Sequence, residues 1–252
     1  MPSQLTAILI TLNEERNIGR AIASLQGVAD EVIVVDSFSA DKTPEIVRSS
    51  GAKLVQKEWM GYSATKNFAN SLATHSYILS IDADEALNEE LKKNIIALKK
   101  NGLNGVYSAN RMTNYLGKWI RHSGWYPDWK VRIFPKAETK WVGEFVHEEL
   151  EFSTPQKVTR LGGILEHYSY YSYADHRARA DKYSLLTAKK MCAAGKSAGV
   201  LEPYISAAGR FVAMYFIKLG FLDGWKGFKI AQISAASNIL KYKELRRLSK
   251  NG

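Results

Sequence analysis

Two aspartates one residue apart, Asp82 and Asp84, directly follow a short apolar run at residues 77–81. Carboxylates at this spacing on a turn can share a hard divalent cation, because such cations prefer oxygen ligands. Mg²⁺ or Mn²⁺ held in this way would neutralise the negative charge that develops on a departing diphosphate. A solvated acidic turn is the alternative, and the position directly after a buried-looking strand favours the metal site.

A hydroxyl, an amide and a carboxylate come together where the apolar run at residues 5–12 ends. They belong to Thr11, Asn13 and Glu14. Side chains of these types can read the donor and acceptor edge of a nucleobase. The same residue types also cap helices, so an N-terminal helix cap is the competing interpretation.

Three further residues could contact a nucleotide. Asp36 follows the strand-like run at residues 31–35 and could contact a base or a ribose, or could sit in a turn. Lys66 opens an otherwise apolar helical stretch and could meet a phosphate, although an exposed helical lysine is the commoner case. Arg132 could bind a phosphate through two parallel hydrogen bonds, or could lie on the surface of a strand.

The elements that would position these residues alternate between strands and helices. Strands are expected at residues 5–12, 31–35, 53–56 and 77–81, and helices at 18–25, 43–50, 62–73 and 88–100. The alternation predicts an α/β fold with a mainly parallel sheet flanked by helices. Such sheets bind ligands at the carboxyl ends of their strands, so Asn13, Asp36 and Asp82 should meet there. Strand-like segments follow at 106–110, 130–134 and 163–167, and helices dominate from Tyr173 onward.

In this order the motifs resemble those of the family 2 glycosyltransferases, which have the Rossmann-like GT-A fold. The matching stretches are TLNEE, VVDSFSADKT, GYSATKNFA and LSIDADE. Later stretches resemble the bacterial β-1,4-glucosyltransferases of the lipopolysaccharide inner core, namely DWKVRIF, VGEFVHEEL, LEHYSYYS and GFLDGWKGF. The resemblance implies a UDP-hexose donor, which in that subgroup is UDP-glucose, inversion at the anomeric carbon, Mg²⁺ or Mn²⁺, and a lipid-linked saccharide acceptor.

The resemblance also implies roles for individual residues. It makes Asp84 the direct metal ligand and Asp82 a ribose or metal-water contact. It makes four residues contacts of the donor nucleotide, and Lys66 a further contact of the same donor. The four are Thr11, Asn13, Glu14 and Asp36.

An inverting transfer needs one carboxylate to take the proton of the acceptor hydroxyl. Asp128 and Glu148 are the candidates, and Glu148, which follows His147 in a compact polar turn, is favoured. Many relatives carry the base in a Glu-Asp pair, which this chain lacks. His147 and His167 could each bind the metal or the departing diphosphate, or could be packed side chains.

The C-terminal third holds all of the chain's net charge of +10. Residues 1–169 carry 20 basic and 20 acidic side chains, whereas residues 170–252 carry 15 and 5. This asymmetry suggests a polyanionic partner, either nucleic acid or an anionic membrane surface. Residues 211–222 are apolar but too short to span a bilayer, and residues 225–248 mix apolar side chains with cations. Membrane contact through residues 211–252 is expected, and a helix packed on the catalytic domain is the alternative.

The expected organisation is a catalytic domain at 1–170 and a basic helical membrane-association region at 171–252. Within the domain, residues 1–105 would form the nucleotide-sugar half and residues 106–170 the acceptor half. No secretory signal is recognisable, so a cytoplasmic protein, peripheral on the inner face of the cell membrane, is expected. The single cysteine, Cys192, cannot form an internal disulfide.

Two other classes of protein compete with this interpretation. A nucleotidyltransferase that forms sugar nucleotides would need a glycine-rich loop after the first strand, where this chain has the acidic stretch NEERN. A non-enzymatic nucleic-acid-binding protein would fit the basic charge but would leave Asp36, Asp82 and Asp84 without a purpose. A nucleic-acid partner is therefore not expected.

Overall fold

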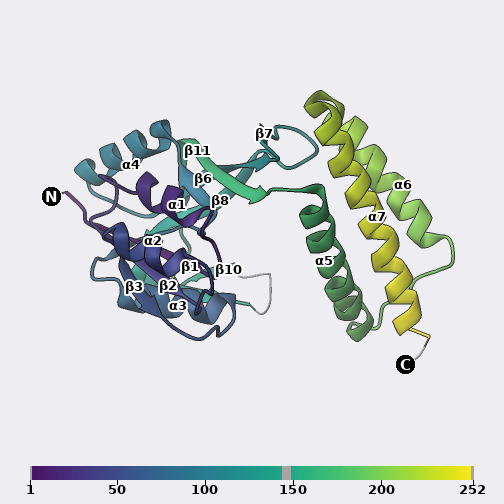
Figure 1. The fold of residues 1–252 in the computed structure, drawn as a ribbon, viewed down its shortest axis with the longest axis horizontal. Helices are drawn as coiled ribbons and strands as arrows, with labels where there is room; N and C mark the ends of the chain where they lie inside the picture. The colour runs from purple at the N-terminus through teal and green to yellow at the C-terminus, as the bar shows by residue number, and fades with distance from the viewer. Residues whose placement is uncertain (1, 144–148, 251–252) are drawn as a thin grey trace. The chain divides into compact units, whose positions relative to one another are not determined.

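The computed structural model describes residues 2–143 and 149–250, which fold into two compact units (Figure 1). Unit 1 consists of Met1–Arg111 and Asp128–His167. Unit 2 consists of Met112–Pro127 and Tyr168–Gly252. Each unit has buried apolar clusters of its own.

The first half of unit 1 is a parallel sheet in the order β3-β2-β1-β4. The strands are β1 (Leu5–Thr11), β2 (Glu31–Asp36), β3 (Lys53–Gln56) and β4 (Tyr77–Ser80), connected by α1 (Ile18–Ser24), α2 (Thr43–Ser49) and α3 (Tyr62–Leu72). Along β1, Leu5, Ala7 and Leu9 belong to one buried cluster and Ile8 belongs to another. The strand is therefore buried on both faces, which explains its continuous apolar run.

The second half of the sheet contains antiparallel pairs. The strands β8 (Asp128–Pro135), β6 (Val106–Tyr115), β11 (Val158–Tyr170) and β5 (Glu85–Leu87) follow β4 in that order, and β7 (Lys118–Trp119) pairs with β6. Helix α4 (Glu89–Asn101) comes after β5, and β9 (Thr139–Val142) and β10 (Glu149–Phe152) form a separate hairpin. The expected α/β fold is confirmed, and its sheet is mixed, because β8 runs antiparallel to both β4 and β6, and β5 runs antiparallel to β11.

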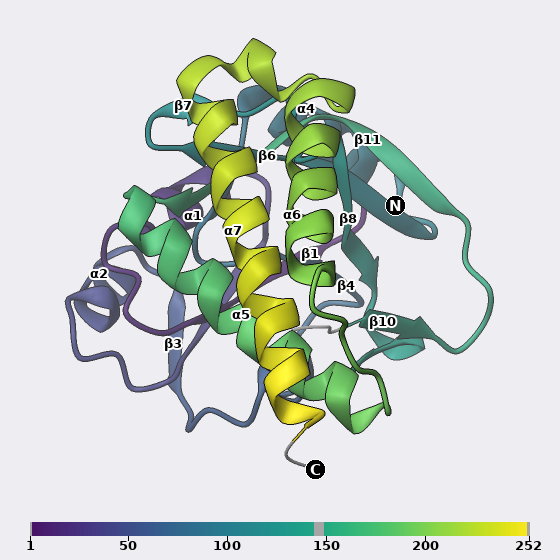
Figure 2. The same cartoon turned by 90° about the vertical axis from the view of Figure 1, so that its right-hand side faces the viewer.

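Three long helices and two short turns make up most of unit 2. They are α5 (Tyr173–Ala193), α6 (Glu202–Val212), the π-helical turn η2 (Ala213–Ile217), the 3₁₀ turn η3 (Gly220–Asp223) and α7 (Gly224–Leu248). Helices α5 and α6 both pack on α7 (Figure 2). The turn η3 approaches α7 so closely that a Cβ atom on Gly227 would lie 1.9 Å from the carbonyl oxygen of Gly220. The helical character expected after Tyr173 is confirmed.

Residues 112–127 join the helices through the buried carboxylate of Asp223. This carboxylate accepts hydrogen bonds from the backbone N–H groups of His122 at 2.9 Å and Arg121 at 3.4 Å. Lys118 Nζ donates to the Asp223 carbonyl at 2.8 Å. Unit 2 therefore contains a segment of the chain that precedes the boundary expected after residue 170.

Candidate functional site

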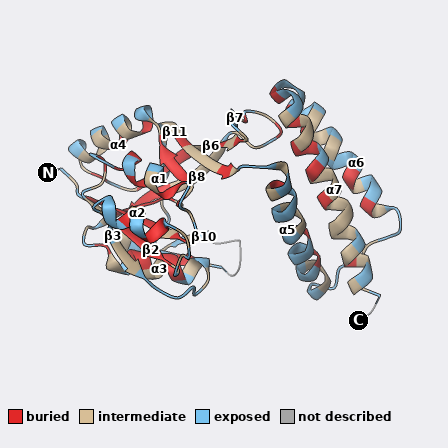
Figure 3. Ribbon diagram, in the orientation of Figure 1, coloured by how far each residue is buried: buried red, intermediate tan, exposed pale blue. Residues whose placement is uncertain are grey.

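The carboxyl ends of β1, β2 and β4 lie at one edge of the parallel sheet. Thr11 is opposite Asp36 in the pairing of β1 with β2, and Ile8 is opposite Ser80 in the pairing of β1 with β4. The residues that follow these strands therefore emerge together, as the sequence predicts. Figure 3 shows that buried residues in this unit lie mainly along the strands of the sheet.

Asp36 is fully buried at the end of β2 and organises the loop that follows. Its carboxylate accepts hydrogen bonds from the backbone N–H of Ser39 at 3.0 Å, from the Ser39 hydroxyl, and from Gln56 Nε2 at 3.3 Å. The Ser39 hydroxyl in turn accepts from the backbone N–H of Asn13 at 2.8 Å. Asp36 thus fixes the loops after β1 and β2 against each other.

Asn13 and Glu14 also tie these loops together. Asn13 Oδ1 accepts from the backbone N–H of Ala40 at 2.8 Å, and the backbone N–H of Glu14 donates to Thr43 Oγ1 at 2.8 Å. Neither side chain caps α1, which begins after Asn17 without a side-chain cap hydrogen bond. Asn13 and Glu14 therefore lie at the predicted site, and their hydrogen bonds hold the loop after β1 against the loop after β2.

Thr11 carries a buried hydroxyl with no hydrogen-bond partner among the described residues. A buried polar group without a partner costs free energy unless a ligand or water satisfies it. Its place beside Asp36, at the end of β1, makes it a natural contact for a ligand bound at this edge.

A chain of alternating charges begins after β4. Asp82 lies 3.3 Å from Lys66 Nζ and 3.1 Å from Arg132 Nη2. Arg132 Nη2 also lies 2.6 Å from the buried carboxylate of Glu85, which is 3.5 Å from Arg111 Nη1. Burial alone would raise the pKa of Asp82, but the nearby cations outweigh it and hold that pKa well below its usual value. Asp82 is therefore ionised at neutral pH.

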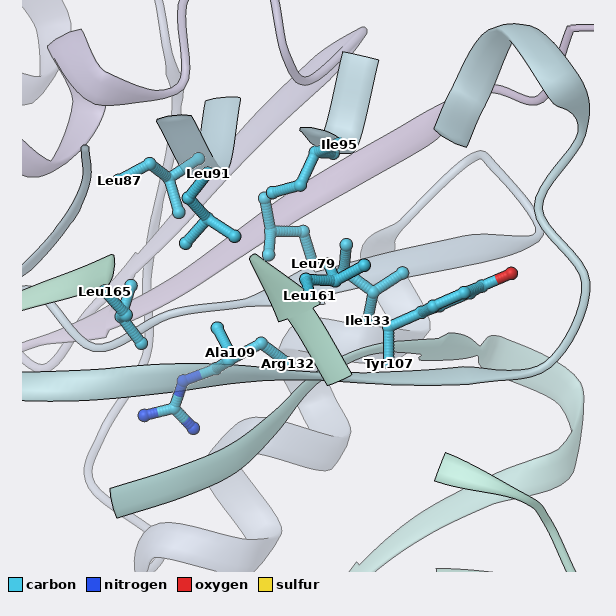
Figure 4. Close-up of a pocket in the computed structure, with 10 residues that line it drawn as sticks. All are labelled: Leu79, Leu87, Leu91, Ile95, Tyr107, Ala109, Arg132, Ile133, Leu161 and Leu165. Carbon is cyan, nitrogen blue, oxygen red and sulfur yellow. The ribbon is translucent and has the colours of Figure 1, made fainter. Parts of the chain in front are cut away.

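Arg132 has an apolar stem and a charged end in different surroundings. Figure 4 shows its aliphatic part beside Ala109 and its guanidinium pointing away from the leucine-rich cluster. Burial would lower its pKa, but the carboxylates of Glu85 and Asp82 raise it above its usual value. Its Nε has no hydrogen-bond partner among the described residues, so one donor stays available.

Asp84 and His167 form the second part of the acidic motif. His167 Nε2 lies 3.2 Å from Asp84 Oδ2, because the antiparallel pairing of β11 with β5 sets His167 opposite Glu85. A carboxylate beside an imidazole is a suitable donor set for a divalent cation that also binds diphosphate oxygens. The described residues contain no group of three or more His, Cys, Asp or Glu side chains that could hold a metal. The remaining ligands would come from the substrate, from water or from residues outside the described ranges, which include His147.

The two candidate bases differ in what can be said of them. Asp128 accepts hydrogen bonds from Arg111 Nε at 2.9 Å and Nη2 at 2.7 Å, and lies 3.1 Å from Lys130 Nζ. Burial would raise the pKa of Asp128, but these two cations lower it below its usual value. Glu148 and His147 lie outside the described residues.

Three residues of the site were missed at the sequence level. Glu85 follows the aspartate pair directly, and its burial between arginines is the property that the sequence did not reveal. Arg111 becomes relevant because the register of β6 with β8 sets it opposite Asp128. Trp141 lies beneath Lys66, with Nζ 4.5 Å from the ring centre. A lysine, an arginine and two carboxylates around one strand end form an enzyme-like charged site.

Comparison with known proteins identifies the class of enzyme. The model of glycosyl transferase family 2 matches residues 6–153. An uncharacterized glycosyltransferase of Rickettsia typhi is 31% identical over 264 residues, which cover 98% of this chain and 88% of that protein. The lipopolysaccharide core biosynthesis glycosyltransferase LpsC of Rhizobium meliloti is 26% identical, with 92% and 90% covered. The chain belongs to glycosyl transferase family 2 and is a glycosyltransferase.

Solved structures were also compared. The crystal structure of S. aureus TarS matches with a TM-score of 0.48 and 17% identity, covering 72% of this chain and 39% of that one. The mixed sheet flanked by helices is the GT-A fold that the sequence motifs imply. The nucleotidyltransferase and non-enzymatic alternatives give way to the family assignment.

Proposed function

We propose that this glycosyltransferase moves a hexose, with inversion, from a UDP-sugar to a lipid-linked saccharide at an anionic membrane surface. The observation that carries the proposal is the pairing of Asp84 with His167 beside the cations of Lys66 and Arg132. The relative named for lipopolysaccharide core biosynthesis supports a saccharide of that kind as the acceptor. Glucose is proposed as the sugar from the resemblance of the sequence to lipopolysaccharide glucosyltransferases.

Asp84 and His167 are the residues that would hold Mg²⁺ or Mn²⁺. Bound there, the cation would supply positive charge against the diphosphate as it leaves. Lys66 and Arg132 add fixed positive charge nearby, and the Arg132 Nε–H, which has no acceptor among the described residues, would donate to a phosphoryl oxygen. Asp82 holds these two cations in place and offers its exposed third to a ribose hydroxyl or a metal-bound water.

Glu148 is the proposed base. Asp128 is a weak proton acceptor, because the cations of Arg111 and Lys130 stabilise its ionised form. Its proposed role is to position Arg111. We therefore expect Glu148→Gln to lower kcat much more than Asp128→Asn, with the rate at saturating donor and acceptor as the readout. Unchanged turnover of Glu148→Gln would remove it as the base.

Membrane contact through residues 211–252 is proposed from charge and exposure. The exposed apolar side chains of this segment are Val212, Phe216, Ile217, Leu219, Phe221, Leu222 and Trp225. No single helix in the described part of the chain is long and apolar enough to cross a bilayer. One pair of helical segments, bent by 71° between them, has the length and composition of a membrane span when the two are taken together, namely Glu202–Ile217 and Gly220–Leu248. A peripheral protein on the inner face of the cell membrane fits the basic charge, because that face is anionic.

Calorimetry with UDP-glucose, UDP-galactose and GDP-mannose, each with and without Mn²⁺, tests the donor and the metal. Wild type should bind UDP-glucose best and only weakly without metal. In Asp84→Ala, Mn²⁺ should no longer strengthen the binding of UDP-glucose. Asp181→Ala removes a carboxylate from a surface ion pair on α5 and should bind UDP-glucose as wild type does. Tight metal-independent binding, or a preference for GDP-mannose, would refute the proposal.

A further inference from the structure

Unit 1 exposes large apolar side chains at one edge of its sheet. Among its described residues, six such side chains are exposed. Four of them lie in the loops after β1, β2 and β3, and a fifth, Tyr62, is the first residue of α3. The two nearest to Asp36 along the chain are Leu12, 49% exposed, and Phe38, 56% exposed. Apolar side chains gathered at a ligand-binding edge call for a partner that covers them.

Leu12 and Phe38 lie on neighbouring loops, between two hydrogen bonds that join these loops. On one side the backbone N–H of Ser37 donates to the Thr11 carbonyl at 2.9 Å. On the other side the backbone N–H of Asn13 donates to the Ser39 hydroxyl at 2.8 Å. Between these two hydrogen bonds lie Leu12 on the loop after β1 and Phe38 on the loop after β2.

Phe38 is held in a backbone conformation that a bulky side chain rarely adopts. Its φ is 57°, in the left-handed region that favours glycine. The conformation is fixed on both sides, because Asp36 accepts hydrogen bonds from the N–H and the hydroxyl of Ser39. A strained residue with an exposed aromatic ring suggests a role in ligand binding rather than in folding.

Two polar side chains near Leu12 and Phe38 indicate what kind of ligand would bind here. Thr11 Oγ1 is buried and has no hydrogen-bond partner among the described residues. Asp36 lies opposite Thr11 in the strand pairing and is buried at the floor of the same edge. The ligand that suits these groups has a flat apolar face and a hydrogen-bonding edge, which are the two properties of a nucleobase.

We propose that Phe38, with Leu12 on the neighbouring loop, is the platform on which the nucleobase of the donor stacks. The inference rests on the proposed function, since it requires a nucleotide donor at this edge. It adds a residue that determines affinity for the base alone, independent of the diphosphate, the sugar and the metal.

The test is nucleotide binding by Phe38→Ala, Phe38→Gly and Phe38→Tyr, measured by calorimetry with UDP and by competition with UMP and ribose 5-phosphate. Stacking of one base on an aromatic ring corresponds to about a tenfold or larger change in affinity. Phe38→Ala should therefore weaken UDP and UMP by about tenfold or more and leave ribose 5-phosphate unchanged. Phe38→Tyr should bind as wild type.

Phe38→Gly separates binding from folding, because glycine accepts the positive φ without strain. It should melt at the same temperature as wild type or higher and still bind UMP weakly. Val158→Ala, which trims an exposed apolar residue elsewhere in unit 1, is the matched control and should bind UMP normally. Equal UMP affinity in wild type and Phe38→Ala would overturn the inference and leave the donor proposal intact. Failure of wild type to bind UDP at all would refute the donor proposal itself.

Discussion

Units 1 and 2 use charge in opposite ways. Unit 1 carries 18 basic and 20 acidic side chains, and its buried charged residues pair with one another around Glu85 and Arg132. Unit 2 carries 17 basic and 5 acidic side chains, and most of its ion pairs join neighbours on a helix surface. Balanced, buried charge fixes the position of catalytic groups, whereas a one-sided excess produces a field that attracts an anionic partner.

Exposed apolar surface divides the units in the same way. Six large apolar side chains are exposed in the described part of unit 1 and fifteen in that of unit 2. Five of the six in unit 1 follow the parallel strands at the sheet edge that carries the polar site, and those of unit 2 belong to the unit with the excess of basic side chains. The first arrangement suits a small ligand, and the second suits the boundary between lipid headgroups and acyl chains.

Removing the carboxylate of Glu85 should produce the largest change. Glu85→Gln leaves the buried guanidinium of Arg132 with less negative charge, and the loss of one partner of a buried ion pair costs about 3 to 5 kcal/mol of stability. Glu89→Gln breaks the exposed pair with Lys92 and should cost less than about 1 kcal/mol. Urea unfolding measures both variants. Equal, small effects would mean that the buried charges of unit 1 are not coupled.

The stability of unit 2 should depend on one buried histidine. Burial lowers the pKa of His176 from 6.5 to about 4, and its Nδ1 lies 2.7 Å from the Tyr115 hydroxyl. Because the unfolded chain takes up the proton more readily, stability should fall as the pH drops from 6.5 to 4. The loss should reach about 3 kcal/mol at most and level off at lower pH.

Urea unfolding at pH 7 and pH 4.5 would measure this effect. Wild type should lose more stability between the two pH values than His176→Gln, which cannot be protonated. If both proteins lose stability equally, His176 does not carry the pH dependence.

The apolar surface of unit 2 should matter for membrane binding and not for donor binding. Ile217 is 74% exposed, and burial of an isoleucine side chain contributes about 2 kcal/mol. Ile217→Asp should therefore lower the partition coefficient onto anionic vesicles by at least about tenfold. Val158→Asp, at an exposed apolar position of unit 1, should partition as wild type. Equal partitioning of all three proteins would place the membrane contact elsewhere.

Single cations of unit 2 should have the smallest effect. Arg246→Gln and Lys229→Gln should each weaken binding to anionic vesicles by about 1 kcal/mol, and the difference should shrink at high salt. Neutral vesicles are the control, because there both variants should match wild type. A loss that is independent of salt and of lipid charge would point to packing rather than to attraction between charges.

Local patterns were sufficient to predict the parallel half of unit 1. The four parallel strands and the helices between them begin and end within one residue of their expected positions, because continuous apolar runs and polar strand ends are local signals. The same locality explains why Asn13, Asp36 and Asp82 could be assigned to one edge.

The rest depends on contacts between distant residues. The strand β5 has only three residues and directly follows the acidic motif, so no alternating pattern announced it. The pairing of Arg111 with Asp128 depends on the register of β6 with β8. Asp223 attaches residues 121 and 122 to the helices across about a hundred residues of chain, and no local pattern predicts that contact.

The most direct test of the central claim measures Mn²⁺ binding by electron paramagnetic resonance, with and without UDP. If Asp84 and His167 hold a cation that also binds the diphosphate, UDP must raise the affinity for Mn²⁺ and Mn²⁺ must raise the affinity for UDP by the same factor. The account predicts this mutual enhancement in wild type and its loss in both Asp84→Ala and His167→Gln. Undiminished enhancement in Asp84→Ala would contradict the account.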